Sequence, residues 1–344
     1  MNHHSIKDSI GTPSKLFTPF NLITAFFLGI FIMTNCSDDV TEPADPVDLS
    51  GVWELTTTVG SNTCGMEEGP GVTDRIILIQ CENEVQIIMG NGIWATATLK
   101  GDHLDFTATE IETDDTGCQT TRIHTGSLSG SDTELEGTFT TTVTFDNDSC
   151  PTQTECTIEN SALLILEDTY VDDCLDRGEF GDPSQSEYIL PWPVGKSYRL
   201  NNSYCIPTGG HRLQQAYDFL IPIGDPVIAS RAGEVRVVKE DSPDDGQGTD
   251  HNHVMIEHED GSVGFYAHLK QFSVTVQVGQ NVEAGETIAL AGHSGTPDVV
   301  HLHVGVYNSF PPVEGDDRAF IYNNMEGPVD CRGGLVNGAT YTAR

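Results

Sequence analysis

Apolar and polar residues alternate in short segments along residues 49 to about 168, and turn-forming residues separate these segments. The segments are "GVWELTTTV", "DRIILIQ", "EVQIIMG", "IWATATLK", "HLDFTATE", "TRIHTGSL", "ELEGTFTTTVTF" and "CTIENSALLILE". A period of two predicts strands with one face toward a core and one toward solvent. No helical period is sustained, so about eight strands joined by short turns predict an up-and-down β-barrel or a curled meander.

Valine and isoleucine fill the strands predicted in the carboxy-terminal half, and glycine and aspartate mark their turns. These strands lie in "PVIASRAGEVRVVKE", "HVMIEHEDGSVGFYAHL", "VTVQVGQNVEAGETIALAG" and "VVHLHVGVY". The second segment predicts a hairpin with "EDG" at its turn. No long helix is predicted, so the expected fold class of the chain is all-β. Residues 169–187 are polar and lack periodicity, and we expect them to form a linker held by Cys174.

The amino terminus has the pattern of a targeting segment. Lys7 and Lys15 precede an unbroken run of twelve apolar or small residues, 22–33. This length fits the core of a signal peptide and is too short to span a bilayer. Cys36 follows, and the arrangement resembles the lipobox of bacterial lipoproteins, although Asn35 stands where glycine, alanine or serine is usual.

We therefore expect residues 1–36 to be a lipoprotein signal peptide and lipobox, with lipid on Cys36. Residues 37–48 are rich in Asp, Pro, Glu and Thr, which is typical of an acidic tether. An ordinary secreted protein cleaved nearby is the alternative. The acidic residues behind the cysteine resemble a signal for the outer face of the outer membrane. The expected location is the cell envelope, as an outer-membrane lipoprotein that is periplasmic or surface-exposed.

The net charge of the chain excludes one class of partner. Acidic residues outnumber basic ones 52 to 16, and the formal net charge is −36. This charge repels nucleic acid and anionic lipid, so we exclude nucleic acid as a partner and expect membrane contact only through the lipid.

Nine cysteines are present, and if Cys36 carries lipid the remaining eight suit four disulfides in an oxidising compartment. Their pairing does not follow from the sequence, although Cys150 and Cys156 are close enough to close a small loop. No C-x-x-C pair occurs, which argues against a zinc knuckle.

The segment "DLSGVWELT" resembles the opening Gly-x-Trp of lipocalin-like barrels, in which Trp53 would close one end. Such a barrel could hold a small apolar ligand or a sugar. It could also be filled by its own side chains and serve as a spacer or targeting module, which is the usual state of small barrels. Both interpretations stay open.

Two histidines one residue apart lie inside the apolar run "VVHLHVGV", residues 299–306. Side chains alternate along a strand, so His301 and His303 share one face while Leu302 and Val304 share the other. Two imidazoles on one face of an apolar strand need a partner, and a metal ion is a candidate. Asp218 stands between two aromatic residues at the start of a predicted strand and needs a partner as well.

The sequence around the other histidines gives weaker evidence of a functional role. His251, His253 and His258 lie in or near the polar stretch "GTDHNH", and we interpret them as a solvated rim, with His258 a candidate to line a groove. A second metal there is conceivable. His293 lies on a predicted turn, where it could contact substrate.

Several blocks of the carboxy-terminal half, in order, resemble the M23 (lysostaphin/LytM-type) zinc metallopeptidases. They are "YILPWPVGKSY", "GGHRLQQAYDFLIPIGDPVIASRAGEVRVV", "VMIEHEDGSVGFYAHL", "VGQNVEAGETIALAG" and "HLHVGVY". The resemblance spans residues 188 to about 307. It implies an open antiparallel sheet with a groove, and a Zn²⁺ ion bound by two histidines and an aspartate.

Carried over onto this sequence, the resemblance implies His211, Asp218 and His303 as metal ligands. It implies His268 and His301 as catalytic residues that act on the water and the substrate carbonyl at the metal. Six residues separate His211 from Asp218, whereas the compact pattern of the family leaves three. Three protein ligands and one open position are what a catalytic zinc requires.

The resemblance implies a zinc-dependent endopeptidase that cleaves peptide cross-links of peptidoglycan. One alternative is a metal-free LytM-like protein that binds and activates other hydrolases, but all five polar positions are present. A second alternative is a ligand-binding lipoprotein that acts through its barrel. A biotinyl or lipoyl carrier hairpin is disfavoured, because Lys270 precedes the hairpin instead of standing at its tip. The expected domains are 1–36 signal peptide, 37–48 tether, 49–168 lipocalin-like barrel, 169–187 linker and 188–344 metallopeptidase.

Overall fold

The structure is a computed structural model that describes residues 47–90, 92–114, 118–145, 150, 155–169, 172–206, 211, 214–247, 250–295, 299–313 and 315–344. The predicted signal peptide, Cys36 and most of the tether therefore lie outside the described residues. Within the described part, no helix has the length and apolar character needed to cross a bilayer.

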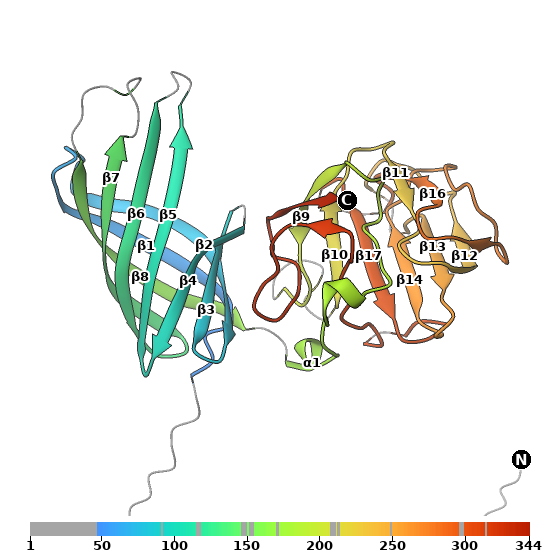
Figure 1. The fold of residues 1–344 in the computed structure, drawn as a ribbon, viewed down its shortest axis with the longest axis horizontal. Helices are drawn as coiled ribbons and strands as arrows, with labels where there is room; N and C mark the ends of the chain where they lie inside the picture. The colour runs from blue at the N-terminus through green and yellow to red at the C-terminus, as the bar shows by residue number, and fades with distance from the viewer. Residues whose placement is uncertain are drawn as a thin grey trace, which may run out of the picture. The chain divides into compact units, whose positions relative to one another are not determined.

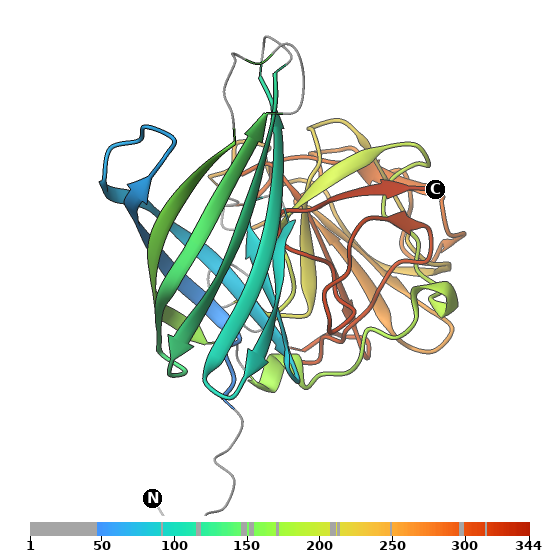
Figure 2. The ribbon, with the colours of Figure 1, turned by 60° about the vertical axis from the view of Figure 1, so that its left-hand side comes forward.

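Eight antiparallel strands close into a barrel in the order in which they occur along the chain (Figures 1 and 2). They are β1 (Gly51–Asn62), β2 (Gly69–Cys81), β3 (Glu84–Met89), β4 (Gly92–Lys100), β5 (His103–Thr113), β6 (Gln119–Gly130), β7 (Glu134–Phe145) and β8 (Cys156–Thr169). The first strand pairs with the last, which closes the barrel. The predicted up-and-down barrel is thus confirmed.

Alternation of side chains fills one part of the barrel with apolar groups. Leu104, Phe106 and Ala108 of β5 are buried, while Asp105 and Thr107 between them face outward. Trp53 is fully buried in the same cluster, and its indole N–H donates to the carbonyl of Leu49 at 2.9 Å. A buried tryptophan needs such a partner for its only polar atom.

The second sheet has nine strands in the order β15-β12-β13-β14-β17-β10-β9-β19-β18, and β11 pairs with β16 beside it. Two short helices, α1 (Asp172–Leu175) and the 3-10 helix η1 (Pro183–Gln185), precede it. Its strands are β9 (Ser197–Asn202), β10 (Ala216–Leu220), β11 (Pro226–Ile228), β12 (Gly233–Lys239), β13 (His253–Glu257), β14 (Val263–Ala267), β15 (Asn281–Val282), β16 (Thr287–Leu290), β17 (Leu302–Tyr307), β18 (Met325–Glu326) and β19 (Thr340–Ala343). The predicted hairpin is β13–β14. The open antiparallel sheet confirms the expected fold class.

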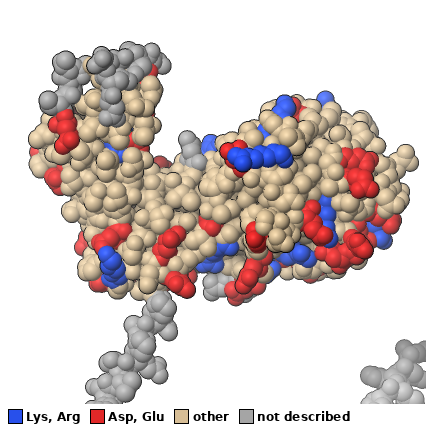
Figure 3. All heavy atoms as spheres, in the orientation of Figure 1, with Lys and Arg blue, Asp and Glu red and all other residues tan. Residues whose placement is uncertain are grey.

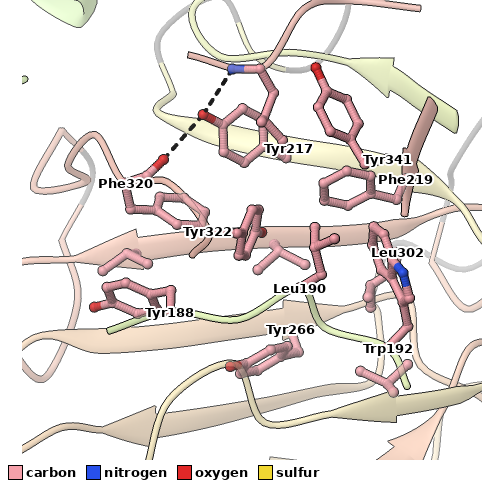
Figure 4. Packing of buried hydrophobic residues seen from close by; sticks show 14 of the residues in the cluster. Tyr188, Leu190, Trp192, Tyr217, Phe219, Tyr266, Leu302, Phe320, Tyr322 and Tyr341 are labelled. Atoms are coloured by element: carbon pink, nitrogen blue, oxygen red, sulfur yellow. Dashed lines mark hydrogen bonds between the residues drawn. The ribbon is translucent and has the colours of Figure 1, made fainter. Parts of the chain in front are cut away.

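One face of this sheet carries an aromatic core (Figure 4). Tyr217, Phe219 and Tyr266 are fully buried there beside Trp192 and Tyr322. The hydroxyl of Tyr217 donates to the carbonyl of Phe320 at 3.2 Å and accepts from the backbone N–H of Leu335 at 3.5 Å. With this face buried, the other face of the same strands is available for polar side chains.

Four disulfides join the eight described cysteines, as predicted: Cys64–Cys156, Cys81–Cys331, Cys118–Cys150 and Cys174–Cys205. The small loop that we considered between Cys150 and Cys156 is wrong. Cys156 begins β8 and bonds Cys64 from the connection between β1 and β2, while Cys150 bonds Cys118 from the connection between β5 and β6.

Cys174 anchors the segment that precedes the second sheet. Besides its disulfide to Cys205, its carbonyl accepts a hydrogen bond from the Gln215 side chain at 2.6 Å. Cys81 at the end of β2 bonds Cys331 across 250 residues of chain, and the backbone N–H of Cys331 donates to Gln86 of β3 at 3.0 Å. A covalent bond therefore joins the barrel to the segment that follows β18.

Acidic side chains are spread over the face drawn in Figure 3, with lysines and arginines among them. Several basic groups are already paired, such as Arg177 with Asp317 at 2.7 Å and Arg231 with Asp260 at 3.0 Å. The excess of negative charge thus remains on the surface, as the composition requires.

Candidate metal centre

Two neighbouring strands carry two of the candidate ligands on the face of the sheet opposite the aromatic core, and His211 lies in the segment between β9 and β10. β17 lies between β10 and β14, and Asp218 of β10 stands directly opposite His303 of β17. Leu302 and Val304 are buried on the core face, so strand alternation turns His303 to the other face. The same alternation places Asp218 opposite to its neighbours Tyr217 and Phe219.

The atoms of these side chains form a nearly equilateral triangle. Asp218 Oδ1 lies 3.1 Å from His211 Nε2 and 3.0 Å from His303 Nδ1, and the two nitrogens are 3.2 Å apart. All three side chains are buried or half-buried. The six residues between His211 and Asp218 therefore do not separate the two side chains.

Neighbouring groups orient two of these three side chains. Nδ1–H of His211 donates to the carbonyl of Ser203 at 2.9 Å, which leaves Nε2 toward the triangle. The Asn202 amide donates to Asp218 Oδ2 at 3.0 Å, which leaves Oδ1 free for the centre. Both neighbours come from the end of β9 or directly after it.

This arrangement fits a small divalent ion. Zinc bonds of about 2.0–2.1 Å in a tetrahedron place the ligand atoms about 3.4 Å apart, close to the observed 3.0–3.2 Å. Two neutral imidazoles and one carboxylate leave a net charge near +1 on a zinc site, and three ligands leave one position open. Within the described part of the chain, this His/Asp/His set is the group of three that could hold a metal.

The ionisation states of Asp218 and His211 depend on each other. Burial alone would raise the pKa of Asp218, but hydrogen bonds and charge from His211 and His303 hold it well below its ordinary value. Burial alone would lower the pKa of His211, and its hydrogen bond to Asp218 raises it instead. Asp218 is therefore a carboxylate, which is the form that binds metal.

The two predicted catalytic histidines lie beside the triangle. His301 directly precedes β17, and its Nε2 is 3.3 Å from Asp218 Oδ1. His268 directly follows β14 with a φ of 60°, and its ring centroid is 4.6 Å from that of His301. Nδ1–H of His301 donates to the Val299 carbonyl at 2.9 Å, and Nδ1–H of His268 to that of Ser294 at 2.8 Å. Each ring therefore presents Nε2.

Burial keeps both of these imidazoles neutral. It lowers the pKa of His301, and it lowers the pKa of His268 to about 3. The left-handed backbone of His268 is uncommon for a residue other than glycine, and such conformations cluster at functional sites. The structure thus brings all five predicted residues to one place.

The other histidines lie differently from our interpretation. His258 is 3% exposed and its Nδ1–H donates to the Ala232 carbonyl at 2.8 Å, so the solvated-rim interpretation is wrong for it. His251 is half-buried, with its ring 5.4 Å from that of His268, and burial lowers its pKa to about 4. His293 packs against Gly246 on its turn, and its contact with substrate stays a prediction.

Sequence reasoning missed Asn202 and the proximity of His251 to His268. The sequence does not indicate that Asn202 supports the metal site, because alternation along a strand would place it on the same face as the fully buried Leu200. A register shift opposite Asp218 and Phe219 reverses that face at the end of β9. His251 could have been suspected from the apolar residues that follow it in "HNHVMI".

Comparison with known proteins finds a family match in the carboxy-terminal half of the chain. Residues 212–315 match the model of Peptidase family M23. The chain therefore contains an M23 peptidase domain, preceded by an eight-stranded β-barrel. The resemblance to this family is confirmed, whereas the lipocalin-like and lipoprotein assignments stay predictions.

Relatives match over part of this chain. The peptidoglycan DD-endopeptidase ShyB of Vibrio cholerae is 35% identical over 129 residues, 36% of this chain and 28% of its own length. The DD-carboxypeptidase/endopeptidase Mpg of Neisseria meningitidis is 39% identical over 92 residues, 27% of this chain and 19% of its own length. The chain thus spans less than a third of either relative. The solved catalytic domain of lysostaphin from Staphylococcus simulans is 27% identical over 39% of this chain and 84% of that chain, with a TM-score of 0.26.

Proposed function

We propose that this protein is a zinc-dependent endopeptidase that cleaves peptide cross-links of peptidoglycan. The observation that carries the proposal is the triangle of His211 Nε2, Asp218 Oδ1 and His303 Nδ1, with sides of 3.0–3.2 Å. The names of the relatives ShyB and Mpg support the choice of substrate.

In this proposal His211, Asp218 and His303 hold the ion. When bound, zinc supplies a Lewis acid that polarises the scissile carbonyl and makes water a nucleophile near neutral pH. Asn202 and Ser203 hold Asp218 and His211 in the orientation that this binding requires.

We assign the proton chemistry to the two remaining histidines. His301 presents an unprotonated Nε2 near Asp218 Oδ1, so it can take a proton from the attacking water. His268 is the group that donates to the substrate carbonyl oxygen as negative charge develops there. Because burial keeps His268 neutral and its Nδ1–H bonds to Ser294, its Nε2 carries no proton in the free protein, so it donates to that oxygen only after it has taken up the proton released by the attacking water.

A metal analysis combined with a digest of purified muropeptides tests the proposal. We expect one zinc per chain and cleavage of cross-linked dimers in the wild type. His303→Ala should lose both zinc and activity, because it removes a ligand. His268→Ala should keep zinc and lose activity by about 10²–10⁴-fold, the usual worth of a proton-transfer group. His103→Ala, on the barrel surface, is the matched control and should behave as wild type.

Two outcomes would change the assignment. If His268→Ala also loses the metal, the division between ligands and catalytic residues is wrong. If the wild type holds no zinc and cuts no muropeptide, the alternative of a metal-free protein that binds and activates another hydrolase is favoured.

We also propose that the protein is a lipoprotein of the cell envelope, with lipid on Cys36, a tether over 37–48, a lipocalin-like barrel over 49–168, a linker over 169–187 and the peptidase over 188–344. The apolar run before Cys36 supports the anchor, and four disulfides support an oxidising compartment. Labelling of cells with a fatty acid tests this. We expect label on the wild type and none on Cys36→Ser, and an unlabelled wild type would refute the anchor.

A further inference from the structure

The interior of the barrel is divided by a polar layer. One apolar cluster surrounds Trp53, and a second, separate cluster contains Val143, Cys156 and Ile158. Between them, His124 of β6 and Asn160 of β8 both bond to the buried hydroxyl of Thr141, at 2.9 and 3.1 Å. Buried polar groups lower stability unless they are satisfied, so we would expect apolar side chains at this level in a barrel that serves only as a filled spacer.

Four rings from four consecutive strands meet at this layer. The centroid of Trp94 (β4) is 5.8 Å from Phe106 (β5) and 5.3 Å from His124 (β6). Phe139 (β7) closes the circuit, with its centroid 6.0 Å from both Phe106 and His124. The four separations form a closed circuit of rings, and a ring face attracts a cation that lies within ~6 Å of its centroid.

A glycine makes the circuit possible. Gly126 of β6 pairs with Phe106 on one side and with Phe139 on the other. A Cβ at Gly126 would lie 2.4 Å from the Cβ of Phe139, so any side chain there would separate the two phenyl rings. The bare backbone therefore allows the rings of β5 and β7 to approach each other across β6.

Glu110 faces this circuit, and Arg122 stands opposite it in the β5–β6 register. Glu110 Oε1 accepts from the indole N–H of Trp94 at 2.6 Å, and Oε2 lies 3.5 Å from His124 Nε2. Arg122 pairs with Glu112 at 2.9 Å, so these two carboxylates and one guanidinium leave a net charge of −1 beside the circuit. His124 Nε2 is buried and makes no hydrogen bond within the described part of the chain. The Glu110 side chain is 42% exposed, so a molecule from solvent can reach it.

Aromatic rings beside a net negative charge are the chemistry that recognises alkylammonium groups. The net negative charge of Glu110, Glu112 and Arg122 would repel an anion and would not attract a neutral apolar ligand. The net charge of −36 raises the local concentration of small cations and favours the same class of ligand.

We propose that the barrel binds a small organic cation, with its ammonium group at the circuit of Trp94, Phe106, His124 and Phe139 and its charge paired with Glu110. This site is separate from the metal centre and does not depend on peptidase activity. The barrel is then a recognition module for an amine-bearing or quaternary ammonium compound.

Tetramethylammonium chloride is the probe, titrated into the full chain by calorimetry and by tryptophan fluorescence. Trp53 and Trp192 are fully buried in apolar clusters, so Trp94 should dominate the change in fluorescence. We expect saturable binding at one site per chain, and none with sodium chloride at equal ionic strength. tert-Butyl alcohol, which has a similar shape without the charge, should bind at least about tenfold more weakly.

Glu110→Gln keeps an acceptor for Trp94 and removes the charge, so it should weaken binding by about tenfold or more. Glu136→Gln removes an equal charge from the outer face of β7 and should leave the affinity unchanged. If Glu110→Gln does not fold, Phe139→Leu replaces it, with the same loss expected. Absence of saturable binding, equal binding of the alcohol, or unchanged affinity in Glu110→Gln and Phe139→Leu would each overturn the proposal.

Discussion

Asn202 is the residue outside the triangle whose removal should affect the metal most directly. Its amide donates to Asp218 Oδ2 at 3.0 Å, and Asp218 is 4% exposed. Asn202→Ala removes this donor and leaves one oxygen of a buried carboxylate without its partner. Water cannot readily replace the donor at so buried an oxygen.

The expected magnitude follows from this geometry. A hydrogen bond to a charged group contributes about 1.5–3 kcal/mol, which corresponds to a factor of roughly 10–150 in an equilibrium constant. Loss of a group that orients a metal ligand typically weakens metal binding by about 10–100-fold. We therefore expect the zinc Kd of Asn202→Ala to rise by about 10–100-fold, with the native fold retained.

The assay is competition for zinc against a chromogenic chelator, with circular dichroism as a check of folding. Asn201→Ala is the matched control, because it removes the same amide one residue away. It should leave the zinc Kd within about twofold of wild type. A folded Asn202→Ala protein with wild-type affinity would show that this hydrogen bond does not orient the ligand, and the account of the site would then be wrong.

Three further predictions concern stability. Replacement of Cys81 and Cys331 by serine should lower the free energy of unfolding by about 2–4 kcal/mol in urea denaturation, because the open chain gains conformational freedom; unchanged stability would contradict this. Gly126→Ala should destabilise the fold by about 1–3 kcal/mol, measured by thermal melting, because its Cβ would overlap that of Phe139; an unchanged melting temperature would show that the barrel adjusts freely. Burial lowers the pKa of His258 below 6.5, so below about pH 6.5 the unfolded state takes up a proton that the folded state does not, and stability falls. Urea unfolding at about pH 7.5 and about pH 5.5 should show a smaller loss in His258→Gln than in wild type, and an equal loss would exclude His258 as a source of the pH dependence.

The elements of the barrel were predictable because each strand has one buried and one exposed face. "ELEGTFTTTVTF" and β7 coincide, and β3 begins where "EVQIIMG" begins. Strand ends were less predictable. β2 begins at Gly69, five residues before the apolar pattern starts, because pairing with β1 continues through residues that are exposed on both faces.

The sequence predicted the metal ligands but not the residues that orient them. His303 and Asp218 stood out because a polar side chain in an apolar strand needs a partner. Asn202 did not stand out, because only the register shift in β9 moves it from the face of Leu200 to the face of Asp218. The cysteines likewise revealed that four disulfides would form, while the pairing of Cys150 with Cys118 depends on which connections meet at one end of the barrel.

The sequence by itself determined which residues alternate, and hence the two all-β parts, the two faces of β17 and the residue types able to bind a metal. Alternation and chemical character are local properties of the chain. Only the tertiary structure decided that His211 Nε2 comes within 3.1 Å of Asp218 Oδ1, and that four rings meet beside Glu110. Such meetings depend on strand order, register and bulges, which arise from pairing between segments distant in sequence.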